Sequence, residues 1–396
     1  MDVSTRGNSS GDVIMNFTYC NFTDFAKTYS GIHGYLSIIV CVFGTIMNIL
    51  NICVLTTKEM RWPTNLILTG LAVSDILVML DYIPFAYYFY LNPEAKLTEG
   101  FFSYTWAIYT YFHALFTLIC HFISCCLTVI LAIWRYIAIS HRQNNRFLQT
   151  VTSIPKTLLT IFLTYIWCPI ICLPLFLTYK ISTTHRSVDV DRRIISERML
   201  ANYTGPRENV SLYTVQMTGS FKNVSYLIYG VVIKLAPCIL LIVLSSRLIS
   251  GLMETKRRRR HLLINSGVPL IDTNGKKTLK HKKTLEEEHQ TDRTTRMLVT
   301  VLLLFLVTEL PQAILGLLSV IIGGSFPDQC YHPLGDLMDF LALINSSINF
   351  ILYCAMSRQF RTTFQEVFRP KWLTKWSPLS QGPLEINGGA TQVTIV

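Results

Sequence analysis

The chain has 396 residues, of which 51% are apolar and only 15% are charged, and its mean hydropathy is +0.38. Soluble domains carry about 25% charged residues, so this composition argues against an ordinary soluble domain and predicts a membrane protein. The formal net charge of +11 raises the question of nucleic-acid binding. The densest basic run, Lys256 to Arg260, directly follows an apolar segment, which favours contact with anionic membrane lipids over a nucleic-acid partner.

Seven apolar stretches are long enough to cross a bilayer. A spanning helix needs about 20 mostly apolar residues, because every backbone polar group must be satisfied within the segment. The stretches are 33–57, 63–91, 103–138, 153–178, 223–250, 297–322 and 333–355. The expected fold is therefore an all-α membrane protein, a seven-transmembrane helix bundle over residues 33–355. The sequence offers neither the paired repeats of a transporter nor a nucleophile–base pair in a soluble segment, so we expect no enzyme.

Charge sets the expected orientation. The segments after the first, third and fifth stretches and the tail hold 21 Lys and Arg, against 10 on the other side. The richer side is expected in the cytoplasm, which predicts a multi-pass plasma-membrane protein with an extracellular N-terminus. Six N-glycosylation sequons fall on the side predicted to be extracellular, at Asn8, Asn16, Asn21, Asn202, Asn209 and Asn223.

Five segments complete the expected organisation. They are a glycosylated N-terminus (1–32), a long second extracellular loop that could cover the bundle (179–222), a basic third intracellular loop with helical ends (251–296), an amphipathic helix (356–368) and a cytoplasmic tail (369–396). In the amphipathic segment Phe360, Phe364 and Phe368 recur every fourth residue, which predicts a short helix lying in the membrane interface. The terminal Thr394 to Val396 suits a PDZ groove, and the alternative is an inert end.

Motifs on successive stretches resemble the rhodopsin-like (class A) G-protein-coupled receptors across nearly all of 33–368. They are Gly44 and Asn48, LAVSD ending at Asp75, Trp134-Arg135-Tyr136, Pro237, Pro311, and NFILY from Asn349 to Tyr353. More narrowly, LAVSDILVMLDYIPFAYYFY, LAIWRYIAISH and RTTRMLVTVLLLFLVTELPQAILGLL resemble the invertebrate myosuppressin and FMRFamide-like peptide receptors, with sex peptide receptors as relatives, and favour a nematode member. The resemblance implies an amidated neuropeptide ligand, a heterotrimeric G protein as partner and Gi/o coupling. The alternative is a receptor for a different peptide or a small molecule.

Ionisable residues inside a membrane are costly, so they mark candidate functional sites. This chain has several, among them Asp75, Asp81, Lys234, Glu309 and Asp339. Glu309 is expected to pair with Lys234, while Asp81 and Asp339 are candidate counter-charges for a basic ligand group. The expected ligand-binding residues are Asp81, Tyr87, Tyr88, Phe112, His113, Thr117, His121, Lys234, Glu309 and Asp339. For the two histidines, a hydrogen-bonded core role is an equal alternative.

The same resemblance implies two further sites. At the family's sodium-pocket positions stand oxygen-bearing residues suited to a hard cation, namely Asp75, Ser124, Asn345 and Asn349. The alternative is a hydrogen-bonded packing network without an ion. No other cofactor is expected. The G-protein-coupling residues are expected to be Arg135, Tyr136 and Tyr353, although Trp134 replaces the acid that usually restrains this arginine. Two further departures are Glu309, in place of an aromatic residue, and Phe350, in place of the proline of the last motif.

Of 11 cysteines, most lie within the apolar stretches, where a small apolar role is expected. Cys20 and Cys330 stand outside them on the extracellular side and are expected to form a disulfide. The bridge usual in the superfamily cannot form, because Thr110 occupies its helix position and the segment 179–222 has no cysteine.

Overall fold

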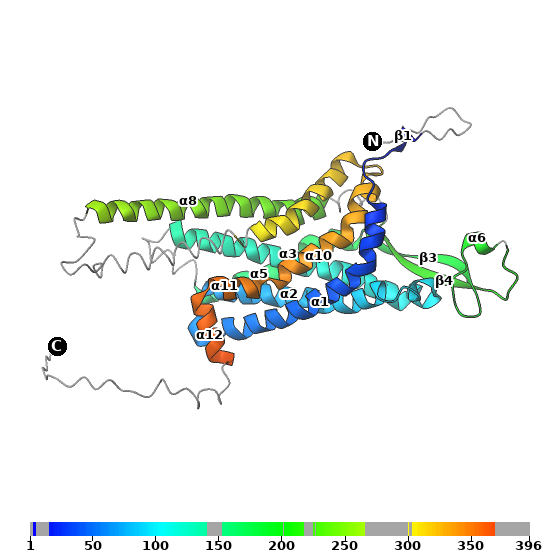
Figure 1. Ribbon diagram of the computed structural model, residues 1–396, viewed down its shortest axis with the longest axis horizontal. Helices are drawn as coiled ribbons and strands as arrows, with labels where there is room; N and C mark the ends of the chain where they lie inside the picture. The colour runs from blue at the N-terminus through cyan, green and yellow to red at the C-terminus, as the bar shows by residue number, and fades with distance from the viewer. Residues whose placement is uncertain are drawn as a thin grey trace.

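The computed structural model describes residues 3–4, 16–140, 153–200, 202–217, 225, 227–265, 300 and 303–368. Within these residues, six helices are long and apolar enough to cross a membrane, and a bent pair supplies a seventh. They are α1 (Thr23–Leu55), α2 (Pro63–Tyr90), α3 (Tyr104–Ser140), α5 (Ile154–Phe176), the π-helix η4 (Ile228–Leu235) continued by α8 (Ala236–Asn265), helix six (Leu303–Ile322), and the pair Pro327–Ser347 and Asn349–Ala355. The expected seven-helix bundle is confirmed (Figure 1).

The seventh helix bends without a proline. The helices α10 (Gly335–Ser347) and α11 (Asn349–Met356) are joined at Ile348, and the two halves of the span meet at 41°. The short π-helix η5 (Pro327–Tyr331) and 3-10 helix η6 (His332–Leu334) precede α10. Phe350, which replaces the family's proline, is buried and packs against Phe360 with ring centroids 5.7 Å apart. Proline is therefore not the cause of the bend.

The helix expected after the bundle is present as α12 (Arg358–Phe368), which lies across one end of the bundle (Figure 1). Phe360 is buried, Phe364 packs against Phe350, and Phe368 is exposed. Arg361 Nη1 donates to the carbonyl of Cys354 at 2.9 Å, which satisfies an end group of α11. We call this the α12 end.

The opposite end carries a β-hairpin that the all-α expectation did not include (Figure 1). Strands β3 (Tyr179–Val188) and β4 (Glu208–Met217) pair antiparallel from Tyr179↔Met217 to Val188↔Glu208. Val188, Val210 and Leu212 form a small apolar cluster against Phe102 and Ile194. Most side chains of the two strands are only partly buried, and among the described ones only Val188, Val210 and Leu212 are fully buried, so the strands lack the strong alternation that reveals a half-buried strand. We call this the hairpin end.

Ion pairs and backbone bonds hold the hairpin end in place of the missing family disulfide. Arg192 Nη1 lies 3.0 Å from Glu99 Oε2, and the amide of Glu99 donates to the carbonyl of Arg192 at 2.9 Å. The amide of Ile194 donates to the carbonyl of Leu97 at 2.8 Å. Two further short elements complete this end, η2 (Ala95–Leu97) and η3 (Glu99–Phe102), with α6 (Glu197–Leu200) in the hairpin loop.

Two helices extend beyond their predicted bounds. Helix α1 begins at Thr23 rather than at 33, with Phe25 stacked on Tyr29 in the added turns. Helix α8 continues to Asn265, where Arg258 pairs with Glu254 at 2.6 Å. The predicted bounds follow the apolar residues that cross the lipid, whereas a helix can continue beyond the bilayer. Residues 1–2 and 5–15 of the N-terminal segment, most of 251–296 and all of 369–396 lie outside the described residues.

The sequons can be placed only in part. Asn21, Asn202 and Asn209 are exposed. Asn16 lies in the short strand β2 (Asn16–Phe17), which pairs with β1 (Val3–Ser4), while Asn8 and Asn223 lie outside the described residues. Glycosylation stays a prediction.

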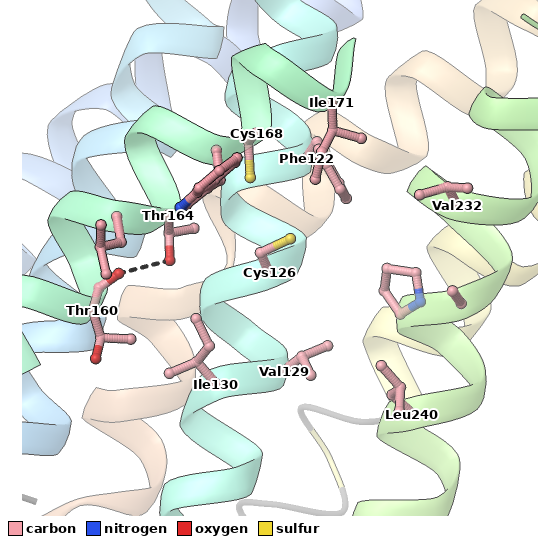
Figure 2. Close-up of a pocket in the computed structure, with 14 residues that line it drawn as sticks. Phe122, Cys126, Val129, Ile130, Thr160, Thr164, Cys168, Ile171, Val232 and Leu240 are labelled. Atoms are coloured by element: carbon pink, nitrogen blue, oxygen red, sulfur yellow. Dashed lines mark hydrogen bonds between the residues drawn. The ribbon is translucent and has the colours of Figure 1, made fainter.

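A groove of about 410 Å³ opens on the side of the bundle between α3, α5 and the fifth helix. Figure 2 shows Cys126, Val129 and Ile130 lining it from α3. Thr164 Oγ1 donates to the carbonyl of Thr160 at 2.9 Å, so this hydroxyl is satisfied within its own helix. None of the described residues that line the groove is charged, which suits contact with lipid.

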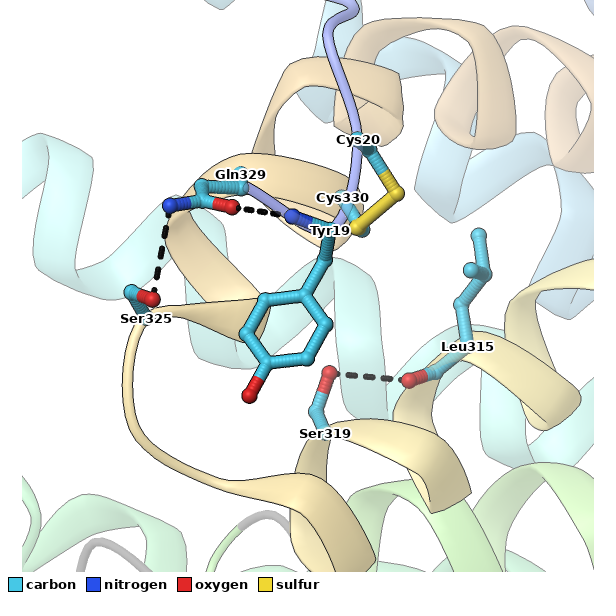
Figure 3. Close-up of a disulfide and its surroundings, with 7 residues drawn as sticks. All are labelled: Tyr19, Cys20, Leu315, Ser319, Ser325, Gln329 and Cys330. Atoms are coloured by element: carbon cyan, nitrogen blue, oxygen red, sulfur yellow. Dashed lines mark hydrogen bonds between the residues drawn. A yellow bond between two sulfur atoms is a disulfide. The ribbon is translucent and has the colours of Figure 1, made fainter. Parts of the chain in front are cut away.

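Cys20 and Cys330 are bonded, with their Cα atoms 5.3 Å apart (Figure 3). The amide of Tyr19 donates to Gln329 Oε1 at 2.8 Å, and the Tyr19 ring packs edge-on against Phe326. The segment before α1 is therefore tied to the start of the seventh helix.

Replacing Cys20 or Cys330 with serine should lower the thermal stability of the purified protein by on the order of 2 kcal/mol, because each change removes the same covalent link. The double variant should lose no more than either single variant. Cys53→Ser, at an exposed free cysteine, is the matched control and should change nothing. Additive losses in thermal unfolding of the double variant would contradict the bond.

Candidate functional site

A cavity of about 500 Å³ lies inside the bundle toward the hairpin end. Its walls come from α2, α3, η4, helix six and α10, and Tyr179 of β3 and His332 of η6 also line it. Pockets of about 300–1,000 Å³ are typical of ligand sites. Five of the ten predicted ligand-binding residues line it, namely His113, Thr117, His121, Lys234 and Asp339.

A buried charge cluster forms the floor of this cavity. Lys234 Nζ lies 2.8 Å from Glu309 Oε2, and His121 Nε2 lies 3.0 Å from the same oxygen. The three side chains come from η4, helix six and α3, and each is at most 8% exposed. The expected Lys234–Glu309 pair is therefore present. Glu309 itself does not line the cavity, because its carboxylate points to these two partners.

Asp81 is already engaged. Its Oδ2 lies 2.7 Å from His113 Nδ1 and accepts a hydrogen bond from Thr117 Oγ1 at 2.9 Å. Its side chain is 9% exposed, and it lies behind the two residues that bind it instead of lining the cavity. The prediction that Asp81 faces the ligand is therefore corrected: it links α2 to α3.

Asp339 is placed differently. It lines the cavity from α10 as an exposed residue, and among the described residues it makes no hydrogen bond or ion pair. Asp336, one turn earlier, also lines the cavity but accepts a hydrogen bond from Tyr90 Oη at 2.7 Å. Asp339 is thus the carboxylate available to a ligand.

Three predicted aromatic contacts lie outside the cavity. Tyr87 and Phe112 are 63% and 52% exposed on the outside of the bundle, and Tyr88 stacks on Phe101 while donating to the carbonyl of Gly100. The sequence prediction took aromatic residues near the end of a helix without fixing which face turns inward. Other rings line the cavity instead, from Tyr82, Phe85, Phe89, Tyr90, Tyr229 and Tyr331.

Helical spacing could have identified part of this set. Tyr82, Phe85 and Phe89 follow a spacing of three and four residues, which places them on one face of α2. Asp336 and Asp339 share a face of α10 for the same reason. Gln312 of helix six, which donates to Tyr229 Oη, has no comparable signal in the sequence.

Asp75 sits deeper in α2 and is fully buried. Ser124 Oγ donates to its Oδ1 at 3.0 Å, and Asn349 Nδ2 donates to its Oδ2 at 3.2 Å. These are two of the three partners expected from the sodium-site resemblance, and within the described part of the chain no hydrogen bond joins Asn345 to Asp75. Asp75 and Ser124 supply oxygens that suit a hard cation, whereas Asn349 presents its amide donor.

Arg135, Tyr136 and Tyr353 lie toward the α12 end. Trp134 is buried, and Arg135 Nε is buried with no hydrogen-bond partner among the described residues. Tyr353 is buried and packs against Phe360 of α12. The local acid that usually binds this arginine is absent here, as the sequence indicated.

This combination, a seven-helix bundle with a polar cavity at one end and an amphipathic helix across the other, is typical of seven-helix membrane receptors. Residues 35–371 match the model of the serpentine type 7TM GPCR chemoreceptor Srw family, and the protein belongs to this family. It is a G-protein-coupled receptor and not an enzyme.

Relatives support the narrower resemblance. Over 90% of its length the chain is 32% identical to the G-protein coupled receptor dmsr-1 of Caenorhabditis elegans, covering 71% of that protein. It is 27% identical to the sex peptide receptor of Drosophila melanogaster, over 95% of this chain and 81% of that protein. It is 23% identical to the FMRFamide receptor of the same insect, over 87% of this chain and 55% of that protein. The predicted kinship with this receptor group is confirmed.

Proposed function

We propose that this protein is a plasma-membrane receptor for an amidated, FMRFamide-like or myosuppressin-like neuropeptide. The hairpin end, with the N-terminus and exposed sequons, faces the outside of the cell, and the α12 end faces the cytoplasm. The receptors for FMRFamide and sex peptide among its relatives support a peptide ligand. The alternative is another peptide or a small molecule, for which a cavity of about 500 Å³ also has room.

The open carboxylate of Asp339 is the observation that carries this proposal. A peptide ending in Arg and an aromatic residue would place its guanidinium against Asp339, where a planar fork suits a carboxylate. Tyr90, Tyr229 and Tyr331 line the same cavity and offer rings for the aromatic side chain. The ligand would enter only with its C-terminal tip, because the cavity is smaller than a whole peptide.

Signalling is proposed to pass through a heterotrimeric G protein of the Gi/o class at the α12 end. The position of Arg135 near the α12 end of α3 supports this role. Tyr136 and Tyr353 are the other two residues expected to contact the G protein.

We propose in addition that Asp75 and Ser124 bind sodium when the receptor is at rest. Measuring agonist affinity during titration with Na⁺, and in parallel with K⁺, tests this. Lipid contacts follow from the exposed apolar helix faces. The proposed PDZ contact of the tail lies outside the described residues.

Asp339→Asn should lower the potency of an Arg-containing amidated peptide by roughly 30-fold or more, because it removes one partner of a desolvated charge pair. The citrulline analogue, which lacks the charge, should lose little. Potency is measured by G-protein dissociation at matched surface expression. Asp81→Asn is the control and should retain the preference for Arg over citrulline. If Asp339→Asn keeps that preference too, Asp339 is not the counter-charge.

Arg135→Ala should abolish G-protein activation while leaving peptide affinity within about 3-fold, because Arg135 lies far along α3 from the cavity residues His113 to His121. Radioligand binding and G-protein dissociation are compared in the same membranes. Arg61→Ala, an exposed arginine at the same end, is the matched control and should signal normally. Normal activation by Arg135→Ala would rule out the coupling role.

A further inference from the structure

Beside the charge pair under the cavity lies a cluster of three metal-ligand residue types. His121 and Cys125 are four residues apart on α3 and share one face, toward Glu309 of helix six. One ligand atom from each residue lies within 4.8 Å of the other two. His121 Nε2 is 3.7 Å from Cys125 Sγ and 3.0 Å from Glu309 Oε2. All three residues are buried.

These separations match a tetrahedral ion. With Zn–N, Zn–O and Zn–S bonds of about 2.0 to 2.3 Å, ligand atoms around zinc lie about 3.4 to 3.6 Å from one another. The 3.7 Å between His121 Nε2 and Cys125 Sγ is close to this range, and the Glu309 carboxylate offers an oxygen within 4.8 Å of both atoms, so side-chain adjustments would complete the geometry. A set of one imidazole, one thiolate and one carboxylate favours zinc over magnesium or calcium, which prefer oxygen alone.

A second observation points to a missing partner. Glu309 Oε1 is buried and has no hydrogen-bond partner among the described residues, although Oε2 binds both Lys234 and His121. A buried carboxylate oxygen left unpaired is costly. An ion between Glu309 Oε1, His121 and Cys125 would satisfy it while Lys234 keeps Oε2.

We propose that His121, Cys125 and Glu309 form a binding site for a transition-metal ion, with Zn²⁺ as the best match. Binding converts the Cys125 thiol to a zinc-bound thiolate and releases its proton to water in the cavity. His121 gives up its hydrogen bond to Glu309 Oε2 and binds the ion through Nε2 as the tautomer protonated on Nδ1, and water from the cavity fills the fourth position. The ion enters from the cavity, which His121 and Lys234 both line.

Occupation of this site would join α3 to helix six beneath the ligand cavity. Because a bound ion stabilises the arrangement of these helices seen here, we expect Zn²⁺ to inhibit an agonist response that requires a different arrangement. This consequence rests on the proposed function, whereas the binding itself does not.

The direct test uses the purified full-length receptor with Zn²⁺ alone, and with Co²⁺ as a spectroscopic substitute. Wild type should bind one Zn²⁺ that depends on Cys125, and its Co²⁺ form should show a thiolate charge-transfer band. Cys125→Ser should weaken Zn²⁺ binding by more than roughly 10-fold, because the loss of a residue that only hydrogen-bonds to a metal ligand already lowers metal affinity by that factor. Cys126→Ser, whose cysteine lines the groove in Figure 2, is the matched control and should bind as wild type does.

A Co²⁺ spectrum of wild type without the thiolate band would overturn the site. This measurement uses only the wild-type protein, so it does not depend on whether a variant folds. Equal Zn²⁺ affinity in wild type and Cys125→Ser would overturn it as well. In cells, Zn²⁺ should reduce the agonist response of Cys126→Ser but not that of Cys125→Ser, and equal inhibition of both would refute the inhibitory role. Failure of amidated peptides to activate the receptor would contradict the proposed function and leave the binding result standing.

Discussion

The buried contact between Lys234 and Glu309 is the constraint on which the centre of this receptor depends. Removing two charges from water costs several kcal/mol per ion, so the pair is tolerable only when its geometry is good. A separation of 2.8 Å, with His121 as a second partner of the carboxylate, meets that condition. The contact fixes how helix six and the fifth helix face α3, and it closes the cavity from below.

The backbone around Lys234 is shaped for this contact. Lys234 lies in the π-helix η4, and a π turn accommodates an extra residue and so rotates the side chains that follow it. Such turns often mark functional sites. On the opposite wall, Asp81 with His113 and Tyr90 with Asp336 join α2 to α3 and α10. The carboxylates near the cavity therefore divide into two uses, since most bind the protein itself and Asp339 stays open.

The sequence predicted best what depends on burial in lipid. The seven apolar stretches and the Lys234–Glu309 pair follow from the cost of exposing polar groups to lipid. The Cys20–Cys330 disulfide follows from a different reason, since these two cysteines lie outside the apolar stretches on the side predicted to be extracellular. The hairpin Tyr179–Met217 did not follow, because its polar strands are stabilised by each other and by a small cluster at Val188. The sequence also did not predict which side chains turn toward the inside of the bundle. Tyr87 and Tyr82 are the same residue type and close in sequence, yet only Tyr82 turns inward. Which carboxylate stays free depends on neighbours such as Thr117, which come from other helices.

The coupling between Lys234 and Glu309 is measured most directly by a double-mutant cycle of Lys234→Met and Glu309→Gln. Thermal unfolding of the purified receptor should show each single variant destabilised by about 3 to 5 kcal/mol, because one buried group loses its charged partner. The double variant, which buries no unpaired charge, should recover most of that loss. If the losses of the two single variants simply add in the double variant, the two side chains do not interact as described, and the buried pair is not what joins these helices.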